Sequence, residues 1–131
     1  MEYLKIDDTF FWKEVPILPG VYFIYSLNEK KPIETRRVLG VDKEGVLYIG
    51  KSENLRDRLR MLWRVLNPNY KANAHTFGEK YNTYKILKDN FPKKTLAIKF
   101  VISKNQKVLE SKMLNEYIKK YGEVPPFNSS K

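Results

Sequence analysis

The chain has 131 residues, with 25 Lys and Arg against 15 Asp and Glu, and its formal net charge is +10. This length predicts one domain, residues 1–131, and the 42% hydrophobic content excludes a disordered chain, while the absence of cysteine excludes disulfides, a thiolate nucleophile and cysteine-ligated zinc. The longest charge-free stretch is too short and too rich in proline to cross a bilayer, and no secretory signal opens the chain, so we expect a cytoplasmic protein without membrane contact.

Runs of β-branched and aromatic residues predict the strands of the first half. Residues 1–18 mix aromatic and acidic side chains and read as a docking strand or a short helix. Residues 21–25 follow a Pro-Gly turn and residues 46–49 follow a Gly turn, so each is expected to be a strand. The 27–45 connection is long for a hairpin, and a further strand at 36–41 would explain its length.

Apolar residues at helical spacing predict three main helices in the second half. Asn54 is the expected N-cap of the first, the second covers residues 77–89, and the third runs from about 107 to 121. Residues 96–102 alternate in polarity and predict a strand between the last two helices. The order predicts an α+β fold: a small central antiparallel β-sheet of three core strands, with room for one extra strand in 27–45, flanked by these helices.

The positive charge is concentrated in one part of the chain. Residues 1–50 hold 7 Lys and Arg against 8 Asp and Glu, whereas residues 51–131 hold 18 against 7. This excess indicates a polyanionic partner, with nucleic acid first and an anionic membrane surface second, although a lysine-rich surface kept for solubility explains it equally well. Arg56, Arg60 and Arg64 recur every four residues and form either a solvated helix face or a contact with a DNA backbone.

Several residues suited to chemistry lie at the ends of these elements. Tyr22 opens one predicted strand and Tyr48 closes another, so strand pairing would bring the two tyrosines together on one face. Arg58 follows Tyr48 by ten residues, and Glu110 lies along the edge of the apolar face of the last helix. Asn128 follows Pro126 and Phe127 in the tail. Each residue taken alone is better explained by strand, helix or loop structure than by catalysis.

Taken in order, these residues resemble the GIY-YIG nuclease family. The resemblance is carried by Gly20-Val21-Tyr22, Tyr48-Ile49-Gly50-Lys51, Asn54 to Arg58, Glu110 and Pro126-Phe127-Asn128, and it covers about residues 19–128, with 1–18 as an N-terminal extension. It implies a compact domain with a three-stranded antiparallel sheet that cuts DNA phosphodiesters with one Mg²⁺ or Mn²⁺ ion.

The resemblance also implies a role for each matched residue. Glu110 would bind the metal, a hard cation that prefers carboxylate oxygens, and Arg58 would bind phosphate through its planar fork of donors. Tyr22 would act as a general base toward the attacking water, a role that needs nearby cations such as Lys51 and Arg58 to favour its phenolate, or it would polarise the water through its hydroxyl. Tyr48 would orient the water or hydrogen-bond the phosphate. Asn128 would hold the other groups in place. The residues expected to bind nucleic acid are Lys51, Arg56, Arg60 and Arg64.

His75 and Leu62 depart from the family pattern. His75 is the one histidine and lies in a loop after the arginine helix, where it is a general base, a phosphate contact or a surface residue. Leu62 stands where relatives often carry a polar active-site residue. The alternative function is therefore a catalytically inactive nucleic-acid-binding module of the same fold, and a third is a protein-interaction domain that uses residues 10–12. We expect the protein to cut with little sequence preference, to recognise a DNA shape, or to take its target choice from a protein partner or from the 27–45 insertion.

Overall fold

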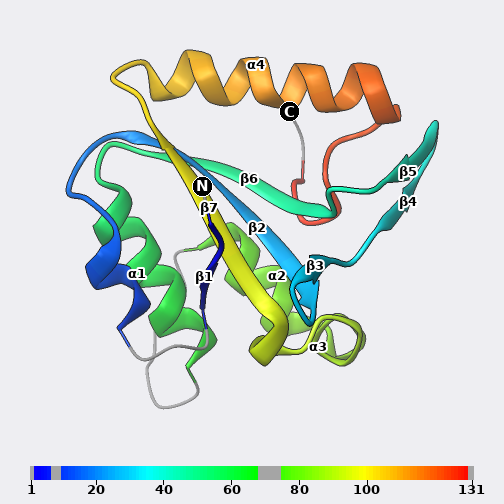
Figure 1. Ribbon diagram of the computed structural model, residues 1–131, viewed down its shortest axis with the longest axis horizontal. Helices are drawn as coiled ribbons and strands as arrows, with labels where there is room; N and C mark the ends of the chain where they lie inside the picture. The colour runs from blue at the N-terminus through cyan, green and yellow to red at the C-terminus, as the bar shows by residue number, and fades with distance from the viewer. Residues whose placement is uncertain (1, 7–9, 68–74, 130–131) are drawn as a thin grey trace.

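The computed structural model describes residues 2–6, 10–67 and 75–129, and a β-sheet with helices on both faces lies at its centre (Figure 1). The central strand is β2 (Gly20–Asn28), which pairs antiparallel with β6 (Val46–Ser52) on one side and with β7 (Leu96–Ile102) on the other. β1 (Leu4–Lys5) pairs with β7, and β3 (Lys31–Pro32) pairs with the end of β2. The predicted α+β class and antiparallel sheet are confirmed.

Three helices lie on one face of the sheet and one lies on the other (Figure 1). The first face carries α1 (Leu55–Leu66), α2 (Thr76–Thr83) and α3 (Lys85–Asn90), whereas α4 (Gln106–Tyr121) crosses the second. α1 begins as predicted, because the Asn54 side chain accepts a hydrogen bond from the Asp57 backbone N–H at 3.1 Å. α4 ends as predicted at Gly122, whose φ of 82° is left-handed.

The single helix predicted over residues 77–89 is wrong, because the chain breaks into α2 and α3 at Tyr84. Tyr84 has extended dihedral angles, φ −115° and ψ 111°. α2 buries Phe77 and Tyr81, whereas α3 has no buried residue, so the two helices do not share one apolar face. The continuous spacing of apolar residues therefore spans two short helices rather than one.

The N-terminal segment contains both structures that its sequence allowed. β1 adds a short strand beside β7, and η1 (Phe11–Glu14) is a 3₁₀ turn that packs on α1. A second 3₁₀ turn, η2 (Lys93–Thr95), precedes β7. No helix in the described ranges is long and apolar enough to cross a membrane.

The insertion holds three short strands, so the single strand predicted at 36–41 is wrong. Besides β3, it contains β4 (Thr35–Arg37) and β5 (Gly40–Asp42), which pair as a separate antiparallel hairpin. The chain reverses between them because Gly40 adopts a φ of 145°, which favours glycine. In Figure 1 this hairpin projects beside the C-terminal end of α4.

Alternation along β2 divides the buried residues into two cores. Tyr22 and Ile24 belong to the core under α1 and α2, whereas Val21 and Tyr25 belong to the core under α4. Both cores contain buried aromatic rings. The first face of the sheet is the one that carries most of the residues singled out from the sequence.

Candidate active site

The register of β2 and β6 brings the two motif tyrosines together. Tyr22 lies opposite Gly50, and Ile24 lies opposite Tyr48, so both tyrosines point to the face covered by α1 and α2. Their ring centroids are 6.0 Å apart. The predicted approach of the two tyrosines on one face is confirmed.

Gly50 leaves the space that the Tyr22 ring occupies. A Cβ atom at Gly50 would lie 2.5 Å from Tyr22 Cζ and 2.6 Å from its hydroxyl oxygen, both well inside van der Waals contact. Tyr22 is fully buried, so its ring has no solvent space to move into. The Tyr22 ring on the paired strand therefore leaves no room for a side chain at position 50.

We expect Gly50→Ala to lower the free energy of unfolding by about 2–3 kcal/mol, because the added methyl overpacks a closed core. Chemical denaturation of the two proteins measures this loss. In a Tyr22→Ala background the same substitution should cost much less, since the clashing ring is gone. An equal cost in both backgrounds would show that Tyr22 is not what Gly50 accommodates.

His75 lies in the same buried cluster. It precedes α2 as its N-terminal flanking residue, and its Nε2 atom is 2.9 Å from the Tyr22 hydroxyl oxygen. Its ring centroid is 5.9 Å from both the Tyr22 and the Tyr48 rings. His75 and Tyr22 are each 0% exposed, which excludes the interpretation of His75 as a surface residue.

Burial keeps both members of the Tyr22–His75 pair neutral. Burial, followed by the influence of Tyr48, raises the pKa of Tyr22 far above its usual value, although Arg58 acts in the opposite direction. Burial lowers the pKa of His75 to about 3, and the positive charge of Arg58 lowers it further. In this conformation desolvation therefore outweighs Arg58, and Tyr22 lacks the phenolate that a general-base role would need.

Arg58 reaches this cluster from the first turns of α1. Its guanidinium interacts with the Tyr22 hydroxyl, and its Nη1 atom lies 3.6 Å from Met61 Sδ. The Arg58 side chain is half-buried. Four residues farther along, Leu62 is fully buried in the core and offers no polar group.

Glu110 lies on the opposite side of the β6 end. Lys51 follows Gly50 and therefore points toward α4, where its Nζ atom is 3.2 Å from Glu110 Oε1. The side chains are 40% and 19% exposed, respectively. Within the described residues, the side chains of the sequence motifs thus form two groups on opposite faces of the sheet. One group surrounds Tyr22 and the other includes Glu110, and Gly50 and Lys51 lie between them.

The donor set at Glu110 fits a magnesium-like ion. No group of three or more His, Asp or Glu side chains that could hold a metal occurs within the described residues. Mg²⁺ retains several waters and is commonly held by one or two carboxylates together with substrate phosphate. A partly exposed carboxylate such as Glu110 meets that requirement, and the metal would replace Lys51 as its partner.

Asn128 holds the backbone of β6 between the two groups. Its Oδ1 atom accepts a hydrogen bond from the Ile49 N–H, and its Nδ2 atom donates to the Ile49 carbonyl, both at 3.0 Å. Phe127 beside it is 1% exposed, and its N–H donates to the Leu47 carbonyl at 2.9 Å. Asn128 therefore contacts the backbone of the Tyr48–Lys51 segment rather than any of its side chains.

The arginines predicted to bind nucleic acid differ in what they contact. Arg56 donates to the carbonyls of Val15 and Lys13, at 2.7 and 3.1 Å, so its guanidinium fastens the N-terminal segment to α1. Arg60 pairs with Asp57 at 2.7 Å, whereas Arg64 is exposed. The Arg64 side chain is thus open to solvent, whereas Arg56 is engaged within the chain.

Phe77 is an aromatic residue of the cluster that was not predicted as part of the site. Phe77 lies 6.0 Å from the Tyr48 ring centroid and 4.5 Å from that of Phe127, so it closes the far wall of the cluster. The sequence signal for Phe77 is its position two residues after His75, which places both at the start of the same helix.

No family model and no curated protein sequence matches the chain. Comparison with solved structures finds the GIY-YIG N-terminal endonuclease domain of UvrC from Thermotoga maritima. A point mutant of that domain bound to its catalytic divalent cation is 23% identical, with 86% of this chain and 84% of that chain covered and a TM-score of 0.40. The domain bound to magnesium is 23% identical, with 86% and 85% covered and a TM-score of 0.39.

The chain is similar in structure to these endonuclease domains. They carry the family name that the sequence motifs predicted.

Proposed function

We propose that this protein is a divalent-metal-dependent endonuclease of the GIY-YIG type that hydrolyses phosphodiester bonds in DNA. The observation that supports it is the convergence of the motif residues on one four-residue stretch of β6, residues 48–51. Tyr22, His75 and Arg58 meet on one side of this stretch, Glu110 meets Lys51 on the other, and Asn128 fixes its backbone.

Different side chains of the candidate site would take different roles in phosphodiester hydrolysis. Arg58 is half-buried beside Tyr22 and carries a planar fork of donors, a shape that suits a phosphate bound through two oxygens. Tyr48 retains 8% exposure whereas Tyr22 has none, so in this proposal Tyr48 rather than Tyr22 is the tyrosine that would meet an attacking water. Mg²⁺ or Mn²⁺ at Glu110 would supply a Lewis acid that stabilises negative charge on the phosphate.

His75 is the final proton acceptor in this proposal. The water proton passes to the Tyr48 hydroxyl, the Tyr48 proton passes to Tyr22, and the Tyr22 proton passes to Nε2 of His75, which is within hydrogen-bond distance. In the free protein burial is the larger effect that opposes protonation of His75, and the positive charge of Arg58 is the smaller one. A phosphate bound at Arg58 would offset only the smaller effect, and burial would still favour neutral His75.

A plasmid nicking assay with Mg²⁺ or Mn²⁺ tests the proposal. We expect the protein to convert supercoiled plasmid to the nicked form, and Arg58→Ala to slow the reaction by about 10²–10³-fold, since a donor aimed at developing charge is lost. Lys88→Ala is the matched control, because Lys88 is an exposed basic residue on α3, outside the candidate site and outside the 27–45 insertion. Equal rates for the protein and Arg58→Ala would contradict the proposal.

The alternative of a binding module without catalysis has one observation in its favour. Lys51 neutralises the Glu110 carboxylate, and the Tyr22–His75 pair is closed to water. This alternative predicts DNA binding that weakens steeply with salt, and no nicked product at any metal concentration. Fluorescence anisotropy with labelled duplex, run beside the nicking assay, separates the two functions. A protein partner or the 27–45 insertion would supply target choice in either case.

A further inference from the structure

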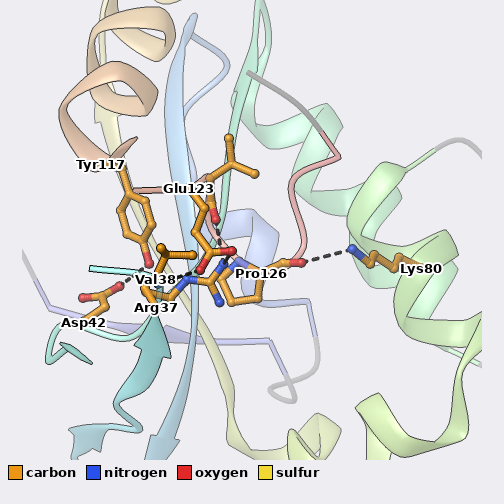
Figure 2. Close-up of polar contacts among 8 residues, drawn as sticks. Arg37, Val38, Asp42, Lys80, Tyr117, Glu123 and Pro126 are labelled. Atoms are coloured by element: carbon orange, nitrogen blue, oxygen red, sulfur yellow. Dashed lines mark hydrogen bonds and ion pairs between the residues drawn. The ribbon is translucent and has the colours of Figure 1, made fainter. Parts of the chain in front are cut away.

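The β4–β5 hairpin is fastened to the chain that follows α4. Arg37 Nη2 lies 2.8 Å from Glu123 Oε1 and donates to the Val124 carbonyl at 2.9 Å. The Val38 N–H donates to the other Glu123 oxygen at 2.9 Å. Figure 2 shows Arg37 and Val38 both facing Glu123. The Glu123 carboxylate therefore holds the hairpin through a side chain and a backbone group together.

A second set of contacts fixes the base of the same hairpin. Asp42 is 1% exposed, and its Oδ2 atom accepts hydrogen bonds from the Tyr117 hydroxyl at 2.8 Å and from the Val46 N–H at 3.0 Å. The Leu39 N–H donates to the Tyr121 carbonyl at 3.0 Å. The hairpin is thus a rigid extension of α4, although it lies outside the main sheet.

Residues 123–128, here called the strap, run from this anchor to the candidate active site. Lys80 of α2 donates to the Pro126 carbonyl at 3.1 Å, as Figure 2 shows. Beyond that contact, Phe127 and Asn128 pair with the backbone of β6. The strap is therefore held at its start by the hairpin, in its middle by α2, which His75 directly precedes, and at its end by β6.

We propose that Arg37 and Glu123 are positioning residues for the active site, which act through the strap and Asn128 on the backbone of β6. This inference rests on the proposed function for its catalytic consequence. Both backbone polar groups of Ile49 are bonded to Asn128, and Ile49 lies between Tyr48 and Gly50. A strap released at Glu123 allows the Tyr48–Lys51 segment to shift relative to Arg58, and small displacements of reacting groups lower rates strongly.

The ion pair between Arg37 and Glu123 lies away from the tyrosines of the candidate active site. Arg37 and Glu123 form an ion pair with side chains 13% and 36% exposed, at the hairpin rather than beside the tyrosines. The position of the ion pair therefore separates a positioning role from direct contact with substrate.

Amide hydrogen exchange followed by NMR tests the inference without any reference to nuclease activity. The Ile49 N–H points to Asn128, whereas the N–H groups of Tyr48 and Gly50 point toward β2 in an antiparallel ladder. In Arg37→Ala we expect the Ile49 amide to exchange about tenfold faster or more, with the amides of Tyr48 and Gly50 unchanged. Arg36→Ala, on the same hairpin, should leave all three amides as they are.

Glu123→Gln keeps the side-chain size and removes the charge, so it provides a second variant if Arg37→Ala does not fold. Unchanged Ile49 exchange in a folded variant that lacks the ion pair would overturn the inference. If the natural protein nicks DNA, the same variants should lower kcat by about tenfold with little change in KM. Faster Ile49 exchange in a protein that nicks no DNA would support the strap and reject the proposed function.

Discussion

Glu110→Ala is expected to reduce metal-dependent nicking by about 10³-fold or more, since the proposed site has one protein carboxylate for the metal. The carboxylate lies on α4 with a partly exposed side chain, and one of its oxygens is engaged by Lys51. Removal of the carboxylate leaves Lys51 as the neighbouring charge, which repels a divalent cation. Nicking rates measured across a range of Mg²⁺ and Mn²⁺ concentrations quantify the loss.

Glu116→Ala is the matched control for this substitution, because Glu116 is an exposed glutamate on the same helix. It should nick plasmid at the rate of the natural protein. DNA binding by Glu110→Ala should persist, since the basic groups are intact. A Glu110→Ala protein that cuts as fast as Glu116→Ala would exclude Glu110 as the metal ligand.

The buried neutral His75 should make the protein lose stability in mild acid. Burial lowers the folded-state pKa of His75 to about 3 from an ordinary value of 6.5. The unfolded chain therefore binds a proton below pH 6.5 that the folded chain does not bind until near pH 3. The contribution of His75 to the free energy of unfolding is fully present above pH 6.5. Below that pH it decreases by about 1.4 kcal/mol for each pH unit, and the total loss is on the order of 4 kcal/mol near pH 3.

Urea denaturation at pH 7 and pH 5 measures this effect in a range where most carboxylates stay ionised. We expect the natural protein to lose about 2 kcal/mol between the two pH values. His75→Gln keeps a polar partner for the Tyr22 hydroxyl but has no titratable group, so its loss should be much smaller. Equal losses in both proteins would show that another group titrates in this window.

The sequence predicted the parts of the site that depend on local rules. Alternation along two antiparallel strands was enough to place Tyr22 and Tyr48 on one face. Helix capping rules located the start of α1 at Asn54 and the end of α4 at Gly122. The position of Arg58 near the tyrosines then follows from its place in the first turns of α1.

The contacts that the sequence did not predict are long-range. Nothing local to His75 indicates that its ring meets Tyr22, 53 residues earlier in the chain. Arg56 has helical spacing typical of a solvated face, yet carbonyls of the N-terminal segment accept its hydrogen bonds. The break at Tyr84 depends on how two short helices pack, which the continuous apolar spacing does not show.

The pairing of Phe127 and Asn128 with β6 also protects the protein from association. Within the described part of the chain, β6 pairs with β2 on one side, so its other side would present free N–H and C=O groups to solvent. Such an edge can add a strand from another molecule and begin aggregation. Two residues occupy this edge at Leu47 and Ile49, one through its main chain and one through an amide side chain that bonds as a main chain would. Phe127 and Asn128 thus also stand where an added strand would have to pair with these two residues.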